Sequence, residues 1–177
     1  MKAIDLSNVE EAKEFTRPEP GGYICGITSV EDVPEKEYLR IEYDIAEGDY
    51  KNFWRSLYES KSFWGGSFIK SYKEKALPFF KAFITAVEKS NRGFKWANDE
   101  TALKRKLVGL VLGEEEYQAN DGTIKTRLYV DQIHSVEKIK AGEFKIPDLK
   151  RYTGARASAQ PDNSLDVTID DDGDLPF

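Results

Sequence analysis

The sequence has few of the residues on which disulfides, metal sites and histidine-based catalysis depend. Its 177 residues include one cysteine, Cys25, and one histidine, His134. A single cysteine excludes an intramolecular disulfide framework and a cysteine-rich metal site. A single histidine excludes multi-histidine zinc sites and disfavours serine–histidine catalysis. We therefore expect no metal, no cofactor and no enzymatic activity.

Long apolar segments are also missing. No apolar run approaches the ~20 residues that cross a bilayer, and the acidic residues of segment 1–14 do not fit a signal peptide. The phosphate-binding pattern Gly-x-x-x-x-Gly-Lys-Ser/Thr does not occur, so nothing indicates a P-loop ATPase. These absences predict a soluble cytoplasmic protein that does not contact membranes.

Basic residues are absent after Arg156, and this gap accounts for the net charge of −6. The last sixteen residues hold six acids: Asp162, Asp166, Asp170, Asp171, Asp172 and Asp174. Without those six, the remaining 26 acids balance the 26 lysines and arginines. The acidic excess therefore lies in the C-terminal segment and does not argue against nucleic-acid binding by the rest of the chain.

Residues 50–107 combine positive charge with aromatic rings. This stretch has thirteen Lys or Arg against five Asp or Glu, and it holds thirteen of the 22 aromatic residues, including all three tryptophans. Aromatic faces stack on bases while cations follow phosphates, so the mixture suits single-stranded nucleic acid. Rings also fill hydrophobic cores, and we expect about half of these to do so.

Hydrophobic periodicity predicts three strands, a helix and a terminal hairpin. The strands are expected at 22–33, 38–45 and 62–69, the helix at 78–89, and the hairpin strands at 107–112 and 123–133 around Asn120-Asp121-Gly122. Short helices are expected at 7–15 and from Asn98. This order predicts a mainly β protein, a five-stranded OB-fold barrel with its helix between strands 3 and 4.

The predicted barrel occupies residues 21–149, between an N-terminal helix and linker at 1–20 and a tail at 150–177. From Arg151 to Thr168 the sequence is rich in Ala, Ser, Pro, Asp and Asn. So few apolar groups cannot offset the entropy of ordering, so the composition predicts a disordered acidic tail.

The segment 169–177 reads Ile-Asp-Asp-Asp-Gly-Asp-Leu-Pro-Phe, and it resembles the acidic tip of bacterial single-stranded DNA-binding proteins. In that family the tip recruits replication, recombination and repair proteins. The resemblance assigns partner binding to Asp170, Asp171, Asp172, Asp174, Leu175, Pro176 and Phe177. A solubilising acidic tail is the alternative, although such a tail does not need the apolar end.

The body is similar to single-stranded DNA-binding proteins of phages and mobile elements of Gram-positive bacteria. The stretches that carry this similarity are 22–27, 37–48, 107–113 and 125–133. The resemblance implies an OB fold that binds and protects single-stranded DNA without sequence specificity during replication and recombination. It departs from the housekeeping bacterial proteins in its N-terminal strand pattern and in an aromatic-rich insertion before the helix.

The candidate DNA-binding residues are aromatics with cations nearby in sequence. They are Tyr38, Arg40, Lys51, Trp54, Arg55, Lys61, Trp64, Lys70, Arg92, Lys95, Trp96, Lys125, Arg127 and Tyr129. For each tryptophan, core packing is an equally good interpretation.

Two other functions stay open at this point. The barrel could act as a protein–protein adaptor in a replication or recombination complex. Alternatively, the run 114–116 with Asp121 and Asp131 could form the carboxylate site of a metal-dependent nuclease, although adjacent glutamates are more often solvated charges. The sequence leaves the oligomeric state open, homo-oligomers included.

Overall fold

The computed structural model describes residues 7–8 and 16–154, and residues 21–134 contain one five-stranded antiparallel sheet against which helices pack. The strands are β1 (Gly21–Val33), β2 (Tyr38–Ile45), β3 (Ser67–Ser71), β4 (Leu107–Gln118) and β5 (Ile124–His134). Their order in the sheet is β3-β2-β1-β4-β5. The expected helix at 7–15 and the expected tail lie mostly outside the described residues.

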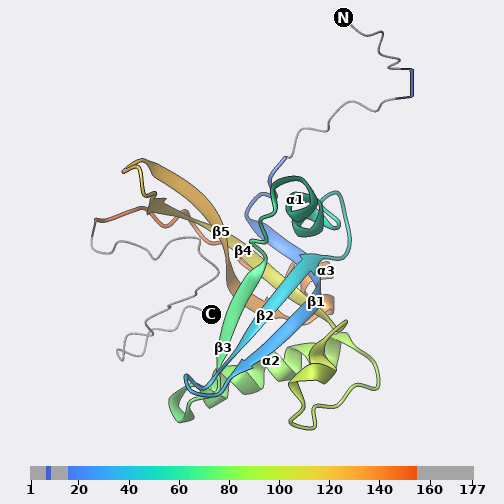
Figure 1. The fold of residues 1–177 in the computed structure, drawn as a ribbon. Helices are drawn as coiled ribbons and strands as arrows, with labels where there is room; N and C mark the ends of the chain where they lie inside the picture. The colour runs from blue at the N-terminus through green and yellow to red at the C-terminus, as the bar shows by residue number, and fades with distance from the viewer. Residues whose placement is uncertain (1–6, 9–15, 155–177) are drawn as a thin grey trace, which may run out of the picture.

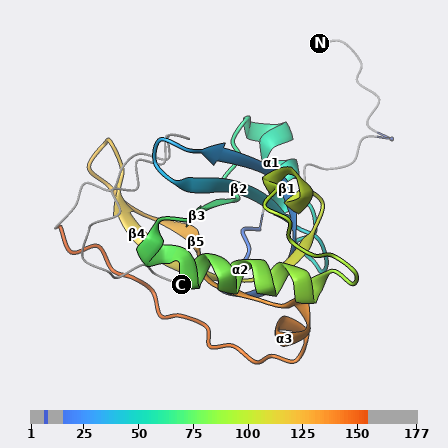
Figure 2. The same ribbon diagram turned by 90° about the horizontal axis from the view of Figure 1, so that it is seen from below.

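Within residues 16–154, three α-helices accompany the sheet (Figure 1). They are α1 (Phe53–Lys61), α2 (Leu77–Ser90) and α3 (Val136–Lys140), with short 3-10 helices η1 (Glu74–Ala76) and η2 (Glu100–Leu103). Figures 1 and 2 show α1 and α2 at opposite ends of the sheet. None of these described helices is long and apolar enough to cross a membrane. The predicted helix between strands 3 and 4 is confirmed as α2.

The predicted closure of the sheet into a barrel is wrong. In the described sheet, β3 and β5 are the two edges and do not pair with each other. Helix α2 contacts both edge strands as well as β4. Side chains of Lys70 on β3, Phe79 on α2 and Ile133 on β5 line the space between them. Side chains and a helix, rather than a ladder of backbone hydrogen bonds, therefore span the gap.

The larger hydrophobic core lies between α2 and one face of the sheet. The alternation in β2 is confirmed, since Leu39, Ile41, Tyr43 and Ile45 are all at most 4% exposed. Helix α2 adds the buried residues Phe83, Ile84, Ala86 and Val87. A smaller cluster joins Ile24 and Val111 to Val136 and Ile139 of α3. Burying both faces of β4 fits its continuous apolar run.

Helix α1 lies in the aromatic-rich insertion, where no helix was predicted. Its N-terminus is capped by a side chain from another element. Asn52 adopts a left-handed conformation with φ of 59° and makes no side-chain cap. Instead, Asp44 Oδ1 accepts from the backbone N–H of Trp54 at 3.0 Å, and Oδ2 accepts from Arg55 at 3.1 Å. The cap comes from β2, so no local pattern around residue 53 announces it.

The β4–β5 hairpin extends further than predicted and projects beyond the other strands (Figure 1). Strand β4 continues to Gln118 instead of ending near 112, and Ile124 near the tip is 50% exposed. Lys150 adds backbone pairing to β4, donating to Glu114 O at 3.0 Å and accepting from Glu116 N at 2.8 Å. The chain therefore returns along β4 after α3.

Substituting Asp44 with alanine should lower the free energy of unfolding by about 1–3 kcal/mol, because buried N–H groups at the start of α1 lose their acceptor. Chemical denaturation monitored by tryptophan fluorescence measures the loss. The exposed Asp49 is the matched control, and Asp49→Ala should change stability by less than about 0.5 kcal/mol. Equal stability of both variants would contradict the capping role.

Candidate nucleic-acid interface

The surface around α1 gathers exposed rings and cations. We call this surface the α1 patch and define it as Lys51, Arg55, Tyr58, Lys61, Phe63 and Trp64. Tyr58 is 54% exposed and Phe63 is 41% exposed, and both are among the most exposed large apolar side chains of the described residues. The three cations are exposed, and Glu59 is the one acid between residues 51 and 64.

Trp64 holds a fixed position within the α1 patch. Its Nε1–H donates to the carbonyl oxygen of Gly66 at 3.1 Å. Its ring meets Tyr58 edge-on, with centroids 6.4 Å apart and planes at 65°. The indole is half-buried and packs against the larger core cluster. A preset ring loses little conformational entropy when it contacts a ligand.

Trp54 belongs to the core rather than to the interface. Its side chain is only 6% exposed, and its ring packs edge-on against Phe53 with a centroid distance of 4.9 Å. A Cβ atom added to Gly65 or Gly66 would collide with the indole, so these glycines allow its close approach. No ring face stays open to a base, and we therefore remove Trp54 from the candidate DNA-binding set.

Tyr38 and Arg40 lie on the face of β2 that points away from the core. Both are half-buried, and the Arg40 guanidinium is 3.8 Å from the carboxylate of Glu31. Across the sheet, Arg40 faces Ile69 of β3 in register. Tyr38 begins β2, whereas α1 follows the end of that strand. The pair thus lies on the β2–β3 surface beyond the α1 patch.

Trp96, Lys95 and Arg92 lie in the loop after α2. The Trp96 ring packs edge-on against Phe80 at 6.3 Å, and its backbone N–H donates to Glu88 at 2.9 Å. That backbone hydrogen bond, aided by Lys95 at 3.4 Å, lowers the pKa of the Glu88 carboxyl. Trp96 is half-buried and Arg92 is exposed. This group is a second, smaller collection of rings and charge.

The predicted contacts on β5 already have partners within the protein. Arg127 Nε is 2.6 Å from Glu115 Oε1, and its guanidinium lies over the Tyr117 ring at 5.2 Å. The ammonium of Lys150 lies 4.0 Å from the centroid of the Tyr129 ring. Lys125, the third residue predicted on this strand, is exposed, whereas Arg127 and Tyr129 are half-buried. Arg127 and Tyr129 are therefore weaker candidates than the sequence indicated.

The glutamate run at 114–116 is paired with arginines. Glu114 pairs with Arg17, Glu115 with Arg127, and Glu116 with Arg151. In the part of the chain that the structure describes, no group of three or more acidic, histidine or cysteine side chains could hold a metal ion. The pairs with Arg17 and Arg151 join the segments before and after the sheet to β4, and the pair with Arg127 joins β5 to β4.

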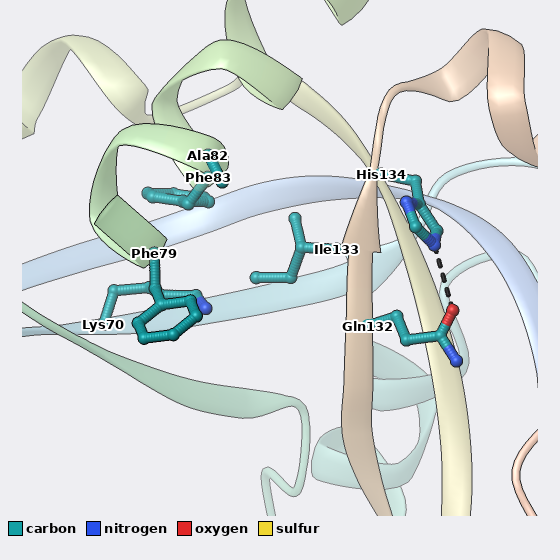
Figure 3. Close-up of a pocket in the computed structure, with 7 residues that line it drawn as sticks. All are labelled: Lys70, Phe79, Ala82, Phe83, Gln132, Ile133 and His134. Carbon is teal, nitrogen blue, oxygen red and sulfur yellow. Dashed lines mark hydrogen bonds between the residues drawn. The ribbon is translucent and has the colours of Figure 1, made fainter. Parts of the chain in front are cut away.

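Lys70 lies apart from the α1 patch. It stands on the core-facing side of β3, opposite Leu39 in register, and lines a pocket with Phe79 and Ile133 (Figure 3). Burial lowers the pKa of its ammonium group. The predicted residues therefore do not form one surface. Lys51, Arg55, Lys61 and Trp64 lie within or beside α1, whereas the other candidates lie on β2, on β5, in the loop after α2 or, for Lys70, on the core-facing side of β3.

Sequence reasoning missed Tyr58 and Phe63, the two most exposed rings of the α1 patch. A usable signal was the spacing of Phe53, Trp54 and Leu57, which puts three apolar residues on one helical face. Tyr58 falls beside that face and is 54% exposed. Because the helix was not predicted, the sequence did not distinguish these exposed rings from the aromatic residues of the core.

Comparison with known proteins adds no independent assignment. The chain matches no protein-family model. No curated protein is significantly similar to it in sequence.

Alanine substitutions should sort the aromatic residues of this region by their effect on stability. Trp54→Ala should cost about 3–5 kcal/mol of unfolding free energy because it leaves a cavity in the core. Tyr58→Ala should cost less than about 1.5 kcal/mol, since the residue is 54% exposed and loses one edge-on contact with Trp64. Urea denaturation of both variants gives the two values. If Trp54→Ala were as stable as the parent protein, Trp54 would not be a core residue and would again be a candidate for DNA binding.

Proposed function

We propose that this protein binds single-stranded DNA through the α1 patch, without sequence specificity, in DNA replication or recombination. One observation carries the proposal: the exposed rings of Tyr58 and Phe63 lie in a segment that also exposes Lys51, Arg55 and Lys61. Exposed apolar surface that is rimmed by polar side chains is typical of a site for a ligand or a partner. Cations around them favour a polyanionic ligand.

The chemistry of the α1 patch favours single strands over duplexes. Unpaired bases expose faces that stack on rings, and every base has such a face, so this binding tolerates any sequence. In a duplex the bases stack on one another, which leaves the rings without a partner. Lys51, Arg55 and Lys61 would then contact the phosphates that flank the stacked bases.

The strand order supports the same proposal. The sequence β3-β2-β1-β4-β5, with α2 between β3 and β4, is the order expected for an OB-type sheet left open between its edges. OB folds bind oligonucleotides on the face of strands 2 and 3 and the adjoining loops. Tyr38 and Arg40 lie on that face, so we propose that the strand continues over them from the α1 patch.

Recruitment of partner proteins by residues 170–177 is a further part of the proposal. It is supported by the acidic and apolar pattern of that segment, which lies outside the described residues. The aspartates would steer toward a basic surface, and Leu175 or Phe177 would enter an apolar pocket of the partner.

Removing both exposed rings should weaken single-strand binding without unfolding the protein. Each base stack is worth about 1–3 kcal/mol, so Tyr58→Ala/Phe63→Ala should raise the Kd for oligothymidine at least tenfold. Fluorescence anisotropy measures the change. The matched control is Ile124→Ala, which removes an equally exposed apolar side chain from the tip of the distant hairpin. If both variants bind like the parent protein, the α1 patch is not the DNA site.

Salt should weaken binding, and the cations of the α1 patch should account for part of that dependence. Each phosphate contact contributes about −0.7 to the slope of log K against log salt for single strands. Replacing Lys51, Arg55 and Lys61 with glutamine should reduce the magnitude of that slope by about 2. Titrations at several salt concentrations give the slope. An unchanged slope, or equal affinity for duplex DNA, would contradict the proposal.

A further inference from the structure

The gap between the two edge strands contains a pocket of about 230 Å³. It opens where β3 and β5 fail to pair, and α2 forms its third wall. The residues that argue for a ligand are four apolar side chains and one cation: Phe79, Ala82, Phe83, Ile133 and Lys70. Figure 3 shows Ile133 pointing into the space between β5 and α2, with Phe79 beside the Lys70 side chain.

The polar side chains at the β5 side of this pocket already bond to other groups. His134 Nε2 and Gln132 Oε1 are 3.0 Å apart, and Gln132 Nε2 donates to the carbonyl oxygen of Lys145 at 3.0 Å. In Figure 3 this pair lies on the side of β5 away from Phe79. These hydrogen bonds fix the two side chains at the rim of the pocket.

Lys70 differs from them. Within residues 7–8 and 16–154, the structure records no hydrogen bond or ion pair for its ammonium group. Its half-buried side chain follows the apolar wall, and burial lowers the pKa of the amine. An ammonium that has lost part of its hydration and gained no counterion is an anchor for an anion, because charge attraction is stronger away from bulk water.

We propose that this pocket binds an aromatic carboxylate, with the ring between Phe79, Phe83 and Ile133 and the carboxylate on Lys70. The apolar walls take the ring out of water, and the ammonium makes a charge-assisted hydrogen bond to the acid. One cation suits one negative charge. A nucleotide phosphate chain would bring several charges to a pocket that offers Lys70 alone among its lining residues.

This site is separate from the α1 patch, which lies at the other end of β3, so the two proposals stand or fall independently. The same ligand chemistry has two sources. A small aromatic acid carries its ring and carboxylate in one molecule, whereas an acidic peptide presents an aspartate next to a phenylalanine. In each of these two ligands, one aromatic ring and one carboxylate are separated by only a few bonds.

The test compares a charged probe with its neutral isostere on the full chain. Isothermal titration or chemical-shift mapping should give 3-phenylpropionate an affinity about tenfold higher than 3-phenylpropanamide, a difference of about 1.4 kcal/mol. Lys70→Met keeps the length of the stem and removes the charge, so it should abolish this preference. Ala82→Phe fills the pocket from α2 and should weaken both probes. The affinity for acetyl-Asp-Phe-amide is measured in the same way. If this peptide binds more tightly than 3-phenylpropionate, the natural ligand is an acidic peptide.

Several results would overturn the site. They are equal affinities of the acid and the amide for the parent protein, no binding at millimolar concentration, or a preference that survives Lys70→Met. The comparison on the parent protein needs no substitution, so an unfolded variant does not remove the test. Oligothymidine binding by Ala82→Phe, measured in parallel, tells failure of this site from failure of the proposed DNA-binding function.

Discussion

The buried carboxylate of Asp44 is the interaction on which the candidate interface depends. It is 7% exposed, and it accepts hydrogen bonds from Ile45, Trp54 and Arg55. A buried charge is tolerated only when such donors replace water, and here those donors include the N–H groups of the second and third residues of α1. The carboxylate thus fixes the start of α1 against β2. With that start fixed, Trp54 enters the core while Tyr58, one turn later, stays largely in solvent.

Some aromatic residues of this protein pack in the core, and others are exposed to solvent. Edge-on ring contacts run from Trp54 through Tyr43, and tilted or edge-on contacts continue through Phe68 to Phe83. Such geometries add to the stabilisation that burial provides, and they connect the α1 end of the molecule with α2. Tyr58 and Phe63 stand outside this series at the α1 end. The same residue type therefore supports the fold inside and offers a stacking surface outside.

The open edge of the sheet gives the molecule a second distinct region. A backbone ladder between β3 and β5 would have closed the space that Lys70, Phe79 and Ile133 now surround. Helix α2 spans the two edges from the end of the sheet opposite α1 (Figure 1). A cation-rich aromatic surface at one end and an apolar pocket with one cation at the other are chemically unlike, which favours different ligands for each.

Local sequence determined the elements whose signals lie within a few residues of one another. Alternation placed Leu39, Ile41, Tyr43 and Ile45 on one face of β2, and helical spacing marked α2 within one residue at each end. Tertiary structure decided the rest, because the deciding contacts join distant parts of the chain. Asp44 accepts a hydrogen bond from Trp54, ten residues further along the chain. Glu115 pairs with Arg127, and Lys150 lies over the ring of Tyr129. Helix α2 contacts both edge strands, where a barrel would have closed. Whether a ring packs or stays exposed depends on what other segments bring against it, and that information is spread over the whole chain.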